Sequence, residues 1–248
     1  VPSNSQMKYY DEGLSMFIHF GINTFTDAEW GDGTEDPNDF QPTDLDTDQW
    51  VRIAKENGFK RILFTAKHHD GFVNYPTKYT DHSIANSTWM DGKGDVLRSF
   101  IDSCEKYDVG AGIYLSPWDR NMPCYSTDID PDYNDVYVDM IKEIFENYGN
   151  ENQDNIVEFW LDGACGEPET RPTYDYARWW ETIYGYNNDV VIKSEYGSTV
   201  HWIGDKECNL GWGGDQNWQT YNKEYLWGGF PDKYNKTTEF NKYLNNGV

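Results

Sequence analysis

Short apolar runs alternate along the chain with segments whose apolar residues recur every three or four positions. The runs predict buried β-strands at Gly13–Ile22, Arg61–Lys67, Val109–Ser116, Ile156–Leu161, Val190–Lys193 and Val200–Ile203. The helical spacing predicts helices over Trp50, Ile53 and Ala54 up to Gly58, and over Asp95–Tyr107, Tyr133–Tyr148 and Tyr174–Tyr184. Strands and helices are therefore expected to alternate along most of the chain.

This order predicts an α/β fold with a parallel sheet. No glycine-rich phosphate loop of the GxGxxG, GKS or GKT type follows any of the strands, which makes an open nucleotide-binding sheet the less favoured alternative. We expect a (β/α)8-like TIM barrel that is incomplete or irregular at its C-terminal end, because only about six of the eight strands of a barrel are recognisable.

The composition limits the classes of molecule that the chain is expected to bind. The 248 residues include 43 acidic and 20 basic ones, and the formal net charge of −23 argues against nucleic acid, whose binding depends on Lys and Arg. Without an apolar run of about 18 residues, we expect no membrane insertion. Aromatic residues make up 17% of the chain, which fits either an aromatic core or a carbohydrate site. The four cysteines permit two disulfides without requiring them.

Histidines gather at the ends of the predicted strands. His19 follows the first strand, and His68 and His69 follow the second. Because parallel strands end at the same edge of a sheet, these imidazoles are expected to lie near one another. A histidine-rich site could hold a metal, but adjacent side chains on an extended backbone point in opposite directions. We expect hydrogen-bond donors to neutral hydroxyls instead, and neither a metal nor a cofactor.

Asp162 follows the fourth predicted strand and precedes Gly163, which allows a sharp turn. One interpretation is a carboxylate that caps this turn. The other is a carboxylate that points into a pocket, where it attacks or stabilises the oxocarbenium-like centre of a sugar. Trp30, Trp118 and Trp160 would form an apolar wall beside it, although core packing explains each of these residues equally well.

Longer motifs carry a resemblance to a known family. The segments MFIHFGINTFTDAEWGDG, FTAKHHDGF, KYTDHS, GKGDVLRSF, GIYLSPWDRN and FWLDGACGE occur in this order between about Met7 and Gly204. Together they resemble glycoside hydrolase family 29, the α-L-fucosidases. The TDAEWGDG and LSPWDRN segments resemble the subfamily that acts on α-1,3/1,4-linked fucose in branched glycans.

The resemblance implies a retaining enzyme that removes fucose from an oligosaccharide or a glycoprotein glycan in two displacement steps. Asp162 matches the nucleophile of the family, and the remaining matches are expected to bind substrate: His19, Glu29, Trp30, His68, His69, Tyr114, Trp118 and Trp160. Fucose is a 6-deoxy sugar, so a pocket that combines imidazoles with aromatic rings suits its methyl group and hydroxyls. The resemblance also implies a secreted, cell-surface or periplasmic location.

The acid/base residue is harder to match. The family pattern R-W-V-G-N-E corresponds here to HWIGDK, so Lys206 stands where the family has Glu. We expect the neighbouring Glu207 to serve, with Glu195 as the second choice. Family members continue into further strands and a β-sandwich, so we expect residues 1–248 to form a single, shortened catalytic domain. Two alternatives remain open: a fucose-binding barrel that has lost its acid/base, and a retaining glycosidase for a related sugar such as galactose.

Overall fold

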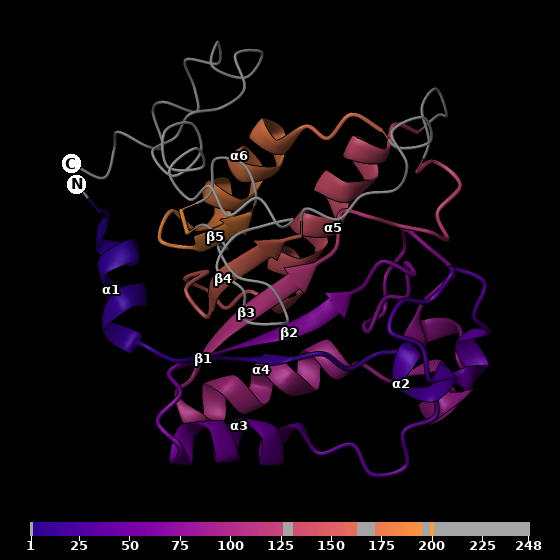
Figure 1. The fold of residues 1–248 in the computed structure, drawn as a ribbon, viewed down its shortest axis with the longest axis horizontal. Helices are drawn as coiled ribbons and strands as arrows, with labels where there is room; N and C mark the ends of the chain where they lie inside the picture. The colour runs from indigo at the N-terminus through magenta and orange to yellow at the C-terminus, as the bar shows by residue number, and fades with distance from the viewer. Residues whose placement is uncertain (1, 126–130, 163–171, 195–198, 201–248) are drawn as a thin grey trace, which may run out of the picture.

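The computed structural model describes residues 2–125, 131–162, 172–194 and 199–200. These residues contain a five-stranded parallel sheet in the order β1-β2-β3-β4-β5 (Figure 1). The strands are β1 (Ser15–Ile18), β2 (Arg61–Lys67), β3 (Gly110–Leu115), β4 (Ile156–Leu161) and β5 (Val191–Ser194). Each strand pairs with the next one along the chain, which is the order of a (β/α) barrel and differs from the reversed order of a doubly wound sheet. The predicted α/β fold class is confirmed.

A helix connects each pair of neighbouring strands. These helices are α3 (Thr47–Glu56), α4 (Val96–Tyr107), α5 (Tyr133–Tyr148) and α6 (Tyr176–Tyr186). An aspartate caps each of them, because the side chains of Asp46, Asp95, Asp132 and Asp175 accept a hydrogen bond from a backbone N–H of the first turn. Helix α3 ends just before Gly58, which has the positive φ of 87° that glycine adopts without strain.

The start of the chain differs from the sequence-based expectation. Helix α1 (Asn4–Glu12) was not predicted, because it buries none of its residues and therefore lacks an apolar stripe; a capping box between Ser3 and Gln6 begins it. The strand expected at Gly13–Ile22 was too long, because the chain turns after Ile18 and forms the short helix α2 (Asn23–Thr26). Three short 3-10 helices, Pro37–Asp39, Ile84–Asn86 and Trp89–Gly92, lie in the longer connections.

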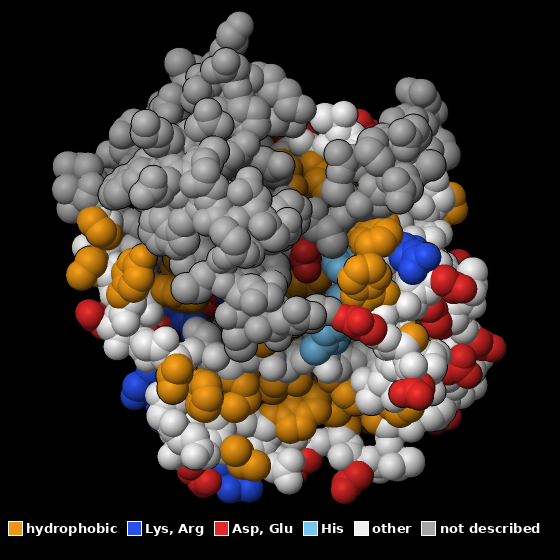
Figure 2. All heavy atoms as spheres, in the orientation of Figure 1, with side chains coloured by type: hydrophobic (Ala, Val, Ile, Leu, Met, Phe, Trp, Pro, Cys, Tyr) orange, Lys and Arg blue, Asp and Glu red, His pale blue; other side chains and the backbone are white. Residues whose placement is uncertain are grey.

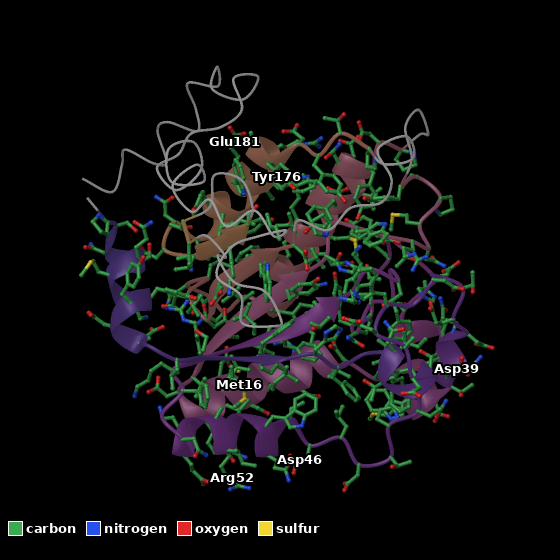
Figure 3. All side chains as sticks on the ribbon, viewed as in Figure 1. Met16, Asp39, Asp46, Arg52, Tyr176 and Glu181 are labelled. Atoms are coloured by element: carbon green, nitrogen blue, oxygen red, sulfur yellow. The ribbon has the colours of Figure 1, made fainter. Side chains whose placement is uncertain are left out.

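The hydrophobic core lies between the sheet and the helices. Helices α3 and α4 cover one part of the sheet, and α5 and α6 cover another (Figure 1). Met16 of β1 packs against this core, whereas Arg52 of α3 is exposed (Figure 3). The buried residues that form the core include Phe64, Ile113 and Phe159 from the strands and Phe100, Ile144, Trp179 and Ile183 from the helices. The amphipathic spacing that predicted these helices therefore corresponds to their buried faces.

The sheet is strongly curved, and side chains on the face opposite the helices meet across it. The rings of Phe17 in β1 and Trp160 in β4 lie 5.1 Å apart, although two strands separate them. In a flat sheet, strands three positions apart would be separated by about 14 Å. Arg61 of β2 likewise reaches Glu158 of β4, with 3.2 Å between Nη1 and Oε2. The strands therefore curl around an interior, as they do in a barrel.

Three remaining expectations concern membranes, cysteines and the last strand. No helix of the described segments combines the length and the apolar character that a membrane crossing requires. Cys104 and Cys124 are buried free thiols, whereas Cys165 and Cys208 lie outside the described residues. Val200 forms a parallel bridge with Lys193, and the rest of the strand expected at Val200–Ile203 also lies outside them.

Candidate active site

The carboxyl ends of the strands bring the predicted histidines together. His19 follows β1, and His68 and His69 follow β2. The ring centroids of His19 and His68 are 4.4 Å apart, and those of His68 and His69 are 4.0 Å apart. The adjacent His68 and His69 do not point in opposite directions, because β2 has ended and the chain turns there towards Gly71, which has a φ of 87°. The expected cluster of imidazoles is therefore present.

Asp162 lies against this cluster. Its Oδ2 accepts a hydrogen bond of 2.7 Å from the hydroxyl of Tyr114 and lies 4.0 Å from Nε2 of His69. The side chain of Asp162 remains 21% exposed, whereas those of Tyr114 and His69 are almost fully buried. This carboxylate is therefore held by buried neighbours while it keeps access to a ligand.

Aromatic rings form two sides of the site. On the outer side, Trp30 lies 6.1 Å from Trp118 and 5.9 Å from His69, measured between ring centroids. On the inner side, Trp160 lies 5.1 Å from Tyr114. Trp30 is 50% exposed, which leaves a large apolar ring available at the edge of the site. Figure 2 shows histidine side chains beside hydrophobic and acidic ones on this face.

A cavity of about 220 Å³ extends from the other side of the histidine cluster. Glu29, His19 and His68 line it, together with residues that the sequence analysis did not select, among them Asn23, Asp70 and Asn74. The carboxylate of Asp162 does not line this cavity. The carboxylate instead lies beside His69, the histidine of the cluster that does not line the cavity.

Asp70 is the most informative of the residues that the sequence analysis missed. Its side chain is buried and accepts hydrogen bonds from the backbone N–H of Phe72 at 2.6 Å and from Nδ2 of Asn23 at 2.7 Å. Its Oδ2 lies 3.7 Å from Nδ1 of His68. Burial raises the pKa of Asp70, but the His68 side chain and the backbone N–H of Phe72 together outweigh burial and hold this pKa below its usual value. Its position in the KHHDG segment is the signal that could have identified it.

A buried ion pair fixes the two loops that carry the histidine and tryptophan side chains. Nζ of Lys67, at the end of β2, lies 2.9 Å from Oδ2 of Asp119 in the loop after β3, and both side chains are almost completely buried. Asp119 also accepts a hydrogen bond of 2.8 Å from the backbone of Met122. The backbone N–H of Arg120 donates to the carbonyl oxygen of His69 at 2.9 Å. The rings of His69 and Trp118, which are tilted by 38° with centroids 5.1 Å apart, are therefore held beside each other.

His69 is kept neutral by its surroundings. Burial lowers its pKa to about 2, and the neighbouring His68 and Lys67 act in the same direction. A neutral imidazole both donates and accepts one hydrogen bond, which suits a sugar hydroxyl. Among the residues that the structure describes, no three His, Cys, Asp or Glu side chains are arranged so that they could hold a metal ion.

Of the predicted site residues, the structure brings together His19, Glu29, Trp30, His68, His69, Tyr114, Trp118, Trp160 and Asp162. Glu207 and Glu195, the candidates for the acid/base, lie outside the described residues. The geometry places a partly exposed carboxylate beside imidazoles and aromatic rings, and such a carboxylate can serve as one of the two that glycosidic bond cleavage uses.

Comparison with known proteins gives one consistent result. A family model described as alpha-L-fucosidase matches residues 32–239. Alpha-L-fucosidase 1 from Arabidopsis thaliana is 41% identical over 90% of this chain and 42% of the plant protein. A Ruminococcus gnavus GH29 fucosidase solved in complex with fucose is 33% identical, with a TM-score of 0.75 over 83% of this chain and 46% of that one. A glycoside hydrolase 29 family member from an unknown rumen bacterium is 38% identical, with a TM-score of 0.76 over 85% and 39%. This chain thus spans less than half the length of these relatives.

Proposed function

The chain belongs to the alpha-L-fucosidase family, and from this premise we propose that it is a retaining glycoside hydrolase that removes terminal α-1,3/1,4-linked L-fucose from glycans. The observation that carries the proposal is the carboxylate of Asp162, held by Tyr114 beside His69 at the carboxyl end of the strands. The fucose seen in the R. gnavus relative supports the choice of sugar. The natural substrate is a fucosylated oligosaccharide or glycoprotein glycan, met in a secreted, cell-surface or periplasmic location.

The reaction has two steps. In the first, an oxygen of Asp162 attacks the anomeric carbon of fucose while the bond to the leaving glycan oxygen breaks, and Glu207 gives this oxygen a proton. In the second, Glu207 takes a proton from water, whose oxygen displaces Asp162 from the anomeric carbon. Two inversions restore the original configuration, so fucose leaves as the α-anomer.

The test of the nucleophile uses the full-length protein with Asp162→Gly. Hydrolysis of an aryl α-L-fucoside should fall about a thousandfold or more, because no group remains to form the covalent intermediate. Azide should restore release of the aryl group and give the β-fucosyl azide, since a small external nucleophile fills the space of the missing carboxylate. Asp39→Ala, at an exposed aspartate, is the control and should retain full activity. Near-full activity of Asp162→Gly, or an α-configured azide product, contradicts the assignment.

The acid/base is tested by Glu207→Ala and Glu195→Ala. The variant that lacks the acid/base should lose most activity on a Lewis-type trisaccharide but much less on an aryl fucoside, whose leaving group needs little protonation. Equal losses on both substrates in Glu207→Ala would contradict its role. Binding of the trisaccharide without any release of fucose by the unmodified protein would favour the fucose-binding alternative, and preferential cleavage of aryl galactosides would favour the related-sugar alternative.

A further inference from the structure

Ser116 lies directly behind His69, although the sequence analysis gave it no role. It follows β3, and its side chain is completely buried. Its Oγ lies 2.7 Å from Nδ1 of His69 and 3.0 Å from the carbonyl oxygen of Trp118. Both distances are those of ordinary hydrogen bonds, so one hydroxyl connects the imidazole to the backbone of the next loop.

The direction of these two hydrogen bonds can be deduced. A carbonyl oxygen only accepts, so the Ser116 hydroxyl is the donor to Trp118. The hydroxyl of Tyr114 also contacts Ser116, but it gives its own proton to Asp162 and therefore offers Ser116 only a second acceptor. The oxygen of Ser116 must then accept a proton from Nδ1 of His69. A neutral imidazole carries one N–H, which leaves Nε2 of His69 with a lone pair and no proton. The low pKa of His69 agrees with this neutral form.

The bare Nε2 faces the carboxylate of Asp162. The two atoms are 4.0 Å apart, and the same oxygen of Asp162 already accepts a hydrogen bond from Tyr114. Nε2 and the carboxylate oxygen both accept hydrogen bonds, so a ligand that enters between them is favoured when it presents an O–H donor. In the opposite tautomer, an Nε2–H group would point towards the carboxylate of Asp162 and could not accept a hydrogen bond from a ligand hydroxyl.

We propose that Ser116 is a positioning residue that holds His69 as the Nδ1–H tautomer, so that Nε2 accepts a hydrogen bond from one ring hydroxyl of fucose beside Asp162. This differs from the expectation that the histidines act as donors. The choice of sugar rests on the proposed function, whereas the tautomer rests on the geometry of Ser116, His69 and Trp118 alone. The arrangement selects sugars that carry a hydroxyl at this position, because an analogue without it offers no donor to Nε2 of the buried His69.

The tautomer is measured by two-bond ¹⁵N–¹H correlation NMR on full-length protein labelled at histidine nitrogen, with the His69 signals assigned by their loss in His69→Gln. The expected result is a pyrrole-like shift for Nδ1 and a pyridine-like shift for Nε2 in the unmodified protein. A pyridine-like Nδ1 overturns the proposal. Ser116→Ala should lose the preference for Nδ1–H, and Ser116→Thr should keep it because the hydroxyl remains.

Activity gives the second measurement. We expect Ser116→Ala to lower kcat/KM on an aryl α-L-fucoside by about ten- to hundredfold, the factor that corresponds to leaving a buried hydrogen-bonding group without its partner. The same two proteins are then compared on aryl fucosides that each lack one ring hydroxyl. For the analogue that lacks the hydroxyl bound by Nε2 of His69, Ser116→Ala and the unmodified protein should have nearly equal kcat/KM. For the other analogues, Ser116→Ala should stay slower. The same ratio of kcat/KM between the two proteins for every analogue indicates a merely structural role and overturns the proposal. A protein that shows the Nδ1–H tautomer but hydrolyses no fucoside refutes the proposed function and leaves the tautomer assignment in place.

Discussion

Two groups of ionisable side chains are associated with the curled sheet, and they differ in how their charges are compensated. The floor cluster consists of Glu12, Arg61, Glu158 and Lys193. Its two cations face two carboxylates, and Arg61 contacts both Glu12 and Glu158. The rim cluster consists of His19, His68, His69 and Asp162, at the carboxyl ends of the strands.

The floor cluster is balanced internally. Burial raises the pKa of Glu158, and the neighbouring Lys193 and Arg61 oppose this rise. Burial lowers the pKa of Lys193, and Glu158 opposes the change. Nζ of Lys193 also lies 4.5 Å from the centre of the Trp160 ring, so the cluster supports the aromatic layer below the rim.

The rim cluster instead combines a neutral imidazole at His69 with a partly exposed carboxylate at Asp162. Neutral polar groups are cheaper to bury than unpaired charges, and they suit a neutral sugar. The paired charges of the floor cluster therefore stabilise the fold, whereas the polar side chains of the rim cluster remain available to a ligand. Four predictions test this contrast, from the largest expected effect to the smallest.

Removing the cation of the floor cluster should destabilise the fold strongly. In Arg61→Met, Glu158 keeps its burial but loses a partner, so the free energy of unfolding should fall by about 3–5 kcal/mol. The matched control is Arg52→Met, because Arg52 pairs with Glu56 at the same 3.2 Å but on the surface; it should cost about 0.5 kcal/mol or less. Urea unfolding measures both. Similar losses in the two variants would contradict the contrast between buried and exposed pairs.

Removing the hydroxyl of Tyr114, which contacts the rim cluster, should affect rate more than stability. Tyr114→Phe removes the donor to Asp162, and kcat should fall about ten- to hundredfold, since hydrogen bonds to charged groups contribute about 1.5–3 kcal/mol. The control is Tyr137→Phe, whose hydroxyl donates to the carbonyl of Leu115 at 2.6 Å among core residues. It should cost about 1 kcal/mol of unfolding free energy and leave kcat unchanged. A loss of kcat in Tyr137→Phe, together with an unchanged kcat in Tyr114→Phe, would contradict the distinction between the rim cluster and the core.

The neutral His69 should make stability depend on pH. Its pKa is about 2 in the fold and about 6.5 when unfolded, so below pH 6.5 only the unfolded chain takes up the proton. The contribution of His69 to the free energy of unfolding is therefore complete above pH 6.5. Below about pH 6, this contribution falls by about 1.4 kcal/mol for each pH unit. Denaturation at pH 7 and pH 5 should show a smaller decline in His69→Gln than in the unmodified protein. His19→Gln, at an exposed histidine, is the control. An identical decline in unmodified protein and His69→Gln would mean that His69 protonates in the fold.

The exposed ring at the edge of the rim should matter only for binding. Trp30→Ala should raise KM for a Lewis-type trisaccharide several-fold and leave the unfolding free energy within about 0.5 kcal/mol, because the ring is 50% exposed. Met90→Ala, at an apolar side chain that is 60% exposed and lies outside the site, should change neither quantity. A large loss of stability in Trp30→Ala would identify the ring as part of the packing.

The sequence alone determined the order of strands and helices, because burial leaves a periodic pattern that is visible without the fold. The apolar run before Asp162 and the spacing of Met140, Ile141 and Ile144 were sufficient for β4 and α5. The sequence also identified the strand ends as the place where His19, the KHHDG histidines and Asp162 would meet, since parallel strands end at one edge. Helix α1 escaped this reasoning because it has no buried face.

Only the tertiary structure decided which of these groups touch. The pairing of Arg61 with Glu158, the contact between Phe17 and Trp160, and the hydrogen bond from Tyr114 to Asp162 join strands that are far apart in the sequence. The role of Ser116 could not be predicted from the sequence either, because it depends on which groups the serine hydroxyl contacts in the fold. Periodicity reports which side of an element is buried, but hydrogen bonding and charge pairing depend on distances of a few ångströms that only the curled sheet fixes.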